Sequence, residues 1–260
     1  MNKGIYIATL ESDSGKSLVT LGLMRTLLGK TAKVGYFRPI INEDKKGGKD
    51  NHISTVLSYF DVDLSYEEAF AYTRNEVIQK RNTGKSGEII DTIIQKYKRL
   101  EERFDFILVE GSDFSGEGSV FEFDVNVLIA KNLGLPAILV ASGVNKTKED
   151  LAGSLQLAYH SFVNKDVNVM ALIANKISPD NLTIAKQILQ EFNTMFQTQA
   201  PQNIRHKRLK KCSKNGAESH AKTGRLKQSK ISKLKHYPGA SWLNELLHSD
   251  LQLTNLVTVM

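Results

Sequence analysis

The sequence predicts an α/β fold in which a parallel β-sheet is flanked by helices. Throughout residues 1–200, short runs rich in β-branched residues alternate with longer runs of helical period, as is typical of a parallel sheet covered by helices. The run from Gly4 to Leu10 has the composition of a buried first strand. A Ser-Gly-Lys-Ser sequence follows this strand and precedes an apolar helical run, so the loop between them lies at the carboxyl end of the strand.

Boundary residues mark the elements that follow. Gly29 ends the first helix, Pro39 stops the second strand, and Pro136 introduces the fourth. Ser178 and Pro179 supply an N-cap and a first helical position for the last helix. The expected strands are residues 4–10, 33–38, 105–110, 137–142 and 167–174. The expected helices are residues 17–28, 86–104, 125–132, 149–163 and 179–192.

Residues 43–85 are polar and irregular in pattern, with one or two short helices expected around residues 52–60 and 66–71. The helix at residues 86–104 is the most clearly amphipathic, because its isoleucines recur at three- and four-residue spacing. No internal repeat is apparent. These elements place one P-loop-like α/β domain at residues 1–196.

The chain changes character after this domain. Residues 201–236 hold 12 Lys and Arg against one acid, Glu218, and no large aromatic residue, which predicts a basic, irregular tail over residues 197–238. Three explanations stay open for it: a tail attracted to RNA or membrane, an inert linker, and a segment translated out of frame. A helix-like pattern resumes with Trp242 and Leu243, so residues 239–260 are expected to form a residual helical segment.

Composition excludes several classes of function. Residues 1–200 hold 23 basic and 25 acidic side chains, so the net charge of +7 belongs to the tail and gives no electrostatic reason to expect nucleic acid. One cysteine, Cys212, excludes an intrachain disulfide and a multi-cysteine metal site. No signal peptide or membrane span is visible, and we expect a soluble cytoplasmic protein.

The sharpest motif is Ser14-Gly15-Lys16-Ser17, between a strand and a helix. This arrangement suits a phosphate, because it brings together backbone N–H groups at a helix start, a flexible glycine, a lysine and a hydroxyl for Mg²⁺. The full P-loop pattern is not met, since Leu10 stands at the first glycine position. The carboxylates of Glu11 and Asp13 would also repel a polyphosphate. A P-loop-shaped turn with weakened nucleotide binding is the alternative.

Three further residues follow strands and could complete a site. Glu110 ends the third strand, where it would hold Mg²⁺ together with Ser17, or would merely cap the next turn. Arg38 ends the second strand and could bind a phosphate or carboxylate, or be solvated. Asn175 follows the last strand and could read an adenine edge. His52 is expected to be an ordinary surface or partly packed histidine, as is His160.

The order of these segments resembles the front of long-form bacterial phosphate acetyltransferases. The resemblance rests on residues 7–19, 34–40, 104–111 and 126–143 and covers roughly residues 1–195. It implies a P-loop NTPase-like fold, similar to that of dethiobiotin synthase, an ATP-dependent enzyme. By this resemblance Lys16 and Ser17 stand at phosphate-binding positions, Arg38 where the synthase has a lysine, Asn175 at a base-reading position and Glu110 at a metal position. Together with Ser14 and Gly15 of the motif, Lys16, Ser17, Arg38 and Asn175 are the expected nucleotide- or phosphate-binding residues, and Ser17 and Glu110 are the expected metal ligands.

The resemblance also implies a function. In that family acetyl transfer between coenzyme A and phosphate, a step of acetate metabolism, belongs to a C-terminal domain that we expect to be missing here. This chain is then a regulatory domain without a catalytic residue, a member of a homo-oligomer in the full-length family, with a nucleotide or small-molecule effector as its partner. Mg-ATP is the cofactor such a site would take, although none is required. Two alternatives stay open: an ATP-dependent ligase of the dethiobiotin synthase type, and an interaction module whose tail contacts nucleic acid.

Overall fold

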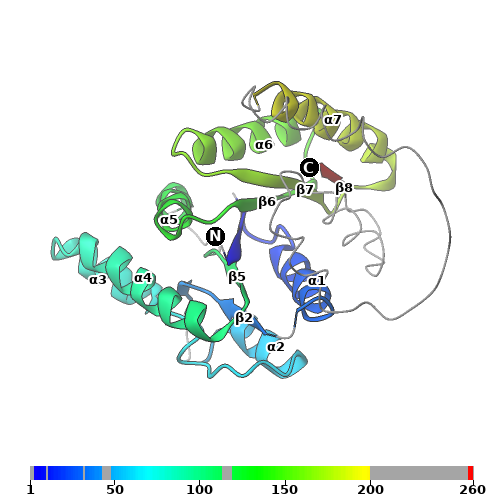
Figure 1. Cartoon of the computed structure of the whole chain (residues 1–260). Coiled ribbons are helices and arrows are strands. Elements are labelled where there is room, and N and C mark those ends of the chain that lie inside the picture. Colours follow the sequence, from blue (N-terminus) through cyan, green and yellow to red (C-terminus); the bar gives the residue numbers. More distant parts are fainter. Residues whose placement is uncertain are drawn as a thin grey trace, which may run out of the picture.

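A computed structural model of the chain describes residues 3–9, 11–31, 33–42, 48–112, 119–199 and 257–259. Its elements alternate between strands and helices (Figure 1). The strands are β1 (Gly4–Thr9), β2 (Val34–Phe37), β3 (Ile40–Ile41), β4 (Tyr72–Thr73), β5 (Phe106–Glu110), β6 (Ala137–Ser142), β7 (Val169–Asn175) and β8 (Val257–Val259). The helices are α1 (Lys16–Leu28), α2 (Asn51–Tyr59), α3 (Arg74–Asn82), α4 (Ser86–Arg103), α5 (Ser119–Leu133), α6 (Lys148–Val163) and α7 (Leu182–Gln199), with a 3₁₀ turn at Pro179–Asn181.

The main sheet has the strand order β2-β5-β1-β6-β7-β8. Every pairing from β2 to β7 is parallel, and only β8 pairs in the antiparallel direction, against β7. The short strands β3 and β4 form a separate parallel pair. The predicted α/β fold with a parallel sheet flanked by helices is therefore confirmed.

Helices cover both faces of this sheet. Figure 1 shows α1 on one side of the strands and α5 on the other. The strand residues are buried almost throughout, including every residue of β1, β2 and β6. A parallel sheet buried on both faces needs such continuous apolar strands, so the same residues that predicted strands also form the core.

The strand order places the loop after β1 at a particular edge. The chain leaves β1 and crosses outward to β2 at the edge of the sheet, whereas later connections lead from β5 to β6 on the other side of β1. Such a reversal opens a crevice at the carboxyl ends of the central strands, where open α/β sheets bind ligands. The predicted motif lies at this position.

Several elements differ from the sequence-based expectation. Strand β4 and helix α3 lie within residues 43–85, where an irregular pattern was expected, and residues 66–71 form turns rather than a helix. A capping box between Thr73 and Glu76 starts α3, and this Thr-x-x-Glu signal was overlooked. Helix α7 reaches Gln199, past the expected boundary at residue 196. Residues 200–238 of the expected tail and the helix around Trp242 lie outside the described residues. Within the expected helical segment at residues 239–260, Val257–Val259 forms a strand instead.

Thr73→Ala is expected to lower the free energy of unfolding by about 1 kcal/mol, because the hydroxyl of Thr73 accepts a hydrogen bond from the amide of Glu76. Urea unfolding of the whole chain measures this. Thr83→Ala at the other end of α3 is the matched control, since the Thr83 hydroxyl donates only to helix carbonyls. Equal losses for the two variants would contradict the capping role.

Candidate functional site

The predicted loop connects β1 to α1, and α1 begins at Lys16. Gly15 has a φ of 82°, in the left-handed region, where glycine is the residue of least strain. A Cβ added at Gly15 would also lie only 2.1 Å from the Asn175 side-chain nitrogen. The loop therefore needs glycine at this position for two independent reasons.

Asn175, at the end of β7, contacts the backbone of this loop through its side chain. Its side-chain nitrogen donates to the Ser14 carbonyl at 2.9 Å, and its oxygen accepts from the amide of Lys176 at 2.8 Å. The Lys176 ammonium group donates to the Asp13 carbonyl at 2.5 Å. The structure thus brings Asn175 to the loop backbone, while its role in reading a nucleotide base stays a prediction.

Glu11 is tied to the end of β6. Its carboxylate accepts a 2.6 Å hydrogen bond from the amide of Ser142 and lies 2.7 Å from the Lys146 ammonium group. The expected repulsion between this carboxylate and a polyphosphate is therefore offset by a neighbouring cation. Asp13 contributes a positive φ of 54° to the same loop.

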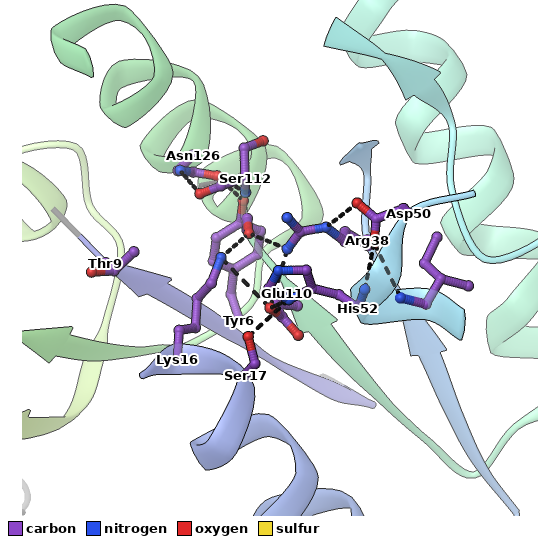
Figure 2. A network of polar contacts seen from close by, with 12 residues as sticks. Tyr6, Thr9, Lys16, Ser17, Arg38, Asp50, His52, Glu110, Ser112 and Asn126 are labelled. Atoms are coloured by element: carbon purple, nitrogen blue, oxygen red, sulfur yellow. Dashed lines mark hydrogen bonds and ion pairs between the residues drawn. The ribbon is translucent and has the colours of Figure 1, made fainter. Parts of the chain in front are cut away.

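Lys16, Arg38 and Glu110 come together beside the loop (Figure 2). All three side chains are at most 2% exposed. The Arg38 Nη1 atom donates to Glu110 Oε1 at 3.1 Å, and Lys16 Nζ lies 3.7 Å from the same oxygen. Both cations also donate to the carbonyl of Gly111. Arg38 is thus a buried partner of Glu110, not a solvated arginine at a strand end.

The strand register produces this convergence. Glu110 ends β5 and pairs with Ile7 of β1, while Phe37, just before Arg38, pairs with Val109 on the other side. Parallel neighbouring strands place their carboxyl ends at one edge of the sheet. Residues separated by 72 positions in the sequence therefore meet because three adjacent strands end together.

The cations determine the protonation state of Glu110. Burial raises the pKa of this carboxyl, but the Lys16 ammonium, the His52 hydrogen bond and the Arg38 guanidinium outweigh burial and lower the pKa to about 2. Burial, and then the Glu110 charge, raise the pKa of Tyr36, whose hydroxyl donates to Glu110 Oε2 at 2.9 Å. Glu110 is thus ionised and Tyr36 protonated at neutral pH.

Two residues of the site, Asp50 and His52, were not predicted from the sequence. Asp50 caps α2 by accepting from the amides of His52 and Ile53, and its carboxylate lies 3.3 Å from Arg38 Nε. His52 Nδ1 lies 2.8 Å from Glu110 Oε1 and 2.9 Å from Ser17 Oγ. His52 is partly packed, as one of the two expected alternatives had it, but its contacts with Glu110 and Ser17 make it part of the site. Because His52 stands alone in the sequence, no spacing pattern indicated its role. Asp50 precedes a helical run and could have been recognised as an N-cap.

Asn126 supports the site from behind. Its side-chain oxygen accepts from the Tyr6 hydroxyl at 2.7 Å and from the amide of Ser112 at 2.9 Å. These bonds hold the backbone that follows β5, including the Gly111 carbonyl that Lys16 and Arg38 contact. No sequence pattern predicted this role, because a buried asparagine on a helix has no characteristic spacing.

A cavity of about 150 Å³ lies between α1 and α2 beside this cluster. It is lined by Ser17, Thr20, Leu21, Asn51, His52, Thr55, Val56 and Glu110. Within the described ranges, no group of three or more His, Cys, Asp or Glu side chains could hold a metal ion. The same ranges contain no helix that is long and apolar enough to cross a membrane.

The sequence profile of the AAA_26 family, described as an AAA domain, matches residues 3–207. The chain belongs to this family. The matched range contains the whole motif, all three cluster residues and Asn175. The predicted P-loop-like domain is thus confirmed as a member of the AAA_26 family.

Proteins with two different names are similar to this AAA_26 chain. It is 40% identical over 68% of its length to a phosphate acetyltransferase of Nitratidesulfovibrio vulgaris, and 36% identical over 81% to one of Synechocystis. It is 26% identical over 53% of its length to the ATP-dependent dethiobiotin synthetase BioD of Clostridium perfringens, 68% of which is covered. The chain spans only 25% and 31% of the two acetyltransferases. The predicted resemblance to the front of phosphate acetyltransferases is confirmed.

Acid is expected to destabilise the AAA_26 domain through Glu110. The folded pKa of about 2 lies below the ordinary value of 4.5, so the unfolded chain takes up the proton first as the pH falls. The resulting stabilisation is complete above pH 4.5 and disappears as the pH falls toward 2, a loss of about 3 kcal/mol.

Urea unfolding at several pH values between 6 and 2.5 measures this loss. Glu110→Gln should be less stable at pH 6 and should lose less stability on acidification. Glu149→Gln, at an exposed position in the first turn of α6, is the control and should follow the unaltered chain. An acid dependence that is the same in all three proteins would contradict the assignment.

Proposed function

We propose that residues 1–196 form the regulatory, nucleotide-binding front domain of a phosphate acetyltransferase, and that acetyl transfer to phosphate is not performed by these residues. One observation carries the proposal: two buried cations, Lys16 and Arg38, meet at the start of α1 and at the carboxyl ends of β2 and β5. A helix start flanked by cations is suited to phosphate groups.

The internal contacts of these cations support a sensing role. Lys16 donates to the Gly111 carbonyl, and Arg38 contacts both Glu110 and Asp50. A phosphate that engages either cation must replace such contacts, and Asp50 starts helix α2. Ligand binding would therefore move α2 and the segment after β5, which is how a site can transmit occupancy to the rest of an assembly.

The side chains beside the loop fit a magnesium ion in their chemistry. Ser17 supplies a hydroxyl at the start of α1, and Glu110 supplies an ionised carboxylate, the oxygen donors that Mg²⁺ prefers. These two residues would hold Mg²⁺, which would neutralise phosphate charge when a nucleotide is bound. Mg-ATP is thus our proposed ligand, with Ser14, Gly15, Lys16, Ser17 and Arg38 around its phosphates and Asn175 near its base.

The proposal extends to partners and location. Like the full-length acetyltransferases that the sequence resembles, this chain would act in a homo-oligomer in the cytoplasm, with a nucleotide or another small effector as its ligand. A membrane or nucleic-acid partner is not part of the proposal.

An ATP-dependent ligase of the dethiobiotin synthetase type is the second candidate. The match to the Clostridium perfringens enzyme favours it, because that match covers 68% of that protein. A ligase of this kind requires ADP release that depends on a second substrate. A coupled assay for ADP, with the second substrate of dethiobiotin synthetase present or absent, distinguishes it from a regulatory domain.

Calorimetric titration of the whole chain with Mg-ATP tests the proposal. Micromolar binding is expected, and Lys16→Ala should weaken it at least about 100-fold because a charged hydrogen bond to phosphate contributes about 3 kcal/mol. Lys30→Ala, which removes an exposed lysine just after helix α1, is the matched control. This variant should bind Mg-ATP as the unaltered chain does.

Circular dichroism must first establish that Lys16→Ala is folded. Absence of heat with millimolar Mg-ATP in the unaltered chain would refute nucleotide binding. Binding that survives Lys16→Ala unchanged would refute the assigned site.

A further inference from the structure

His52 lies between the two side chains that would hold a metal ion. Its Nδ1 atom is 2.9 Å from the Ser17 hydroxyl and 2.8 Å from Glu110 Oε1 (Figure 2). Helix α2 positions the ring, because Asp50 caps this helix through the His52 amide at 2.9 Å. Arg38 in turn holds Asp50. The position of His52 is therefore fixed by the same ion-pair cluster that organises the site.

The two distances match the spacing of neighbouring ligands on one ion. Ligands about 2.1 Å from a metal and at right angles to each other lie about 3 Å apart. The distances from His52 Nδ1 to Ser17 Oγ and to Glu110 Oε1 match this spacing without rearrangement. The three donor groups are a hydroxyl, an imidazole and a carboxylate. One of the three donor atoms is therefore nitrogen and the other two are oxygen.

The cavity between α1 and α2 supplies room and a further polar group. All three donors line this space of about 150 Å³, as does Thr20. The Thr20 hydroxyl is buried and has no hydrogen-bond partner in the described part of the chain. A buried hydroxyl without a partner is costly, and a water molecule bound to a metal in this cavity would supply one.

We infer that His52 is a third metal ligand, and that it shifts the metal preference of the site from Mg²⁺ toward Mn²⁺ and related transition metals. Mg²⁺ prefers oxygen donors, whereas an imidazole nitrogen suits first-row transition metals. In this role the ring is neutral, with Nδ1 toward the metal and the proton on Nε2. The inference rests on the proposed nucleotide site in one respect, because it concerns the metal that accompanies the nucleotide.

The neighbouring charges explain why a nucleotide is needed. Lys16 and Arg38 both lie within 4 Å of Glu110 Oε1, so a divalent cation alone would add to a site already rich in positive charge. The phosphates of ATP supply the compensating negative charge. We therefore expect metal to bind much more tightly with ATP than without it.

Calorimetry of the whole chain with Mn-ATP and with Mg-ATP measures the preference. The unaltered chain should bind Mn-ATP at least about tenfold more tightly, and His52→Ala should lose most of that ratio. His160→Ala is the matched control, because His160 is an exposed histidine at the end of α6, and should keep the ratio.

Pulsed electron paramagnetic resonance of the Mn-ATP complex detects the ligand directly. The unaltered chain should show coupling of Mn²⁺ to one imidazole nitrogen, and the coupling should be lost in His52→Ala. Because this signal is measured in the unaltered chain, it does not depend on whether the variant folds.

Each outcome separates this inference from the proposed function. Equal binding of both complexes without nitrogen coupling would overturn the role of His52 and leave nucleotide binding intact. If neither complex binds, the proposed function fails, and the same spectrum is recorded with millimolar Mn²⁺ alone. Nitrogen coupling there would support ligation by His52, whereas its absence would overturn the inference as well.

Discussion

The buried ion pair between Arg38 and Glu110 is the interaction on which the rest of the site depends. An ionised carboxylate with 1% of its surface exposed is expensive to bury, and here Lys16, Arg38, Tyr36 and His52 surround it. These partners come from three places in the chain, because Tyr36 and Arg38 both belong to the end of β2. One carboxylate at the end of β5 therefore holds together the loop, the end of β2 and the start of α2.

This constraint links fold to function. A parallel sheet buried on both faces leaves its polar positions at the strand ends, and the strand order β2-β5-β1 brings three of those ends together. In the proposed function, a phosphate would replace the contacts that now satisfy Lys16 and Arg38. The chain belongs to the AAA_26 family and is similar to phosphate acetyltransferases and to BioD.

The sequence predicted the central strands and most helices well, because those elements are long and continuous in pattern. It also singled out Lys16, Arg38, Glu110 and Asn175 as candidate site residues, because each stands at the end of a strand or the start of a helix. It could not reveal that Asn175 braces the loop or that Arg38 and Glu110 are paired, since both facts depend on which strands are neighbours. His52 and Asn126 were missed for the same reason: their partners lie 58 and 120 positions away.

A double-mutant cycle on Arg38→Met and Glu110→Gln tests the central pairing most directly. Urea unfolding of the unaltered chain, both single variants and the double variant gives the coupling energy. Each single variant leaves one buried charge without its partner, so the double variant should be more stable than the summed losses imply, by more than about 1 kcal/mol. Strictly additive losses would contradict the account, because they would mean that the two side chains do not stabilise each other.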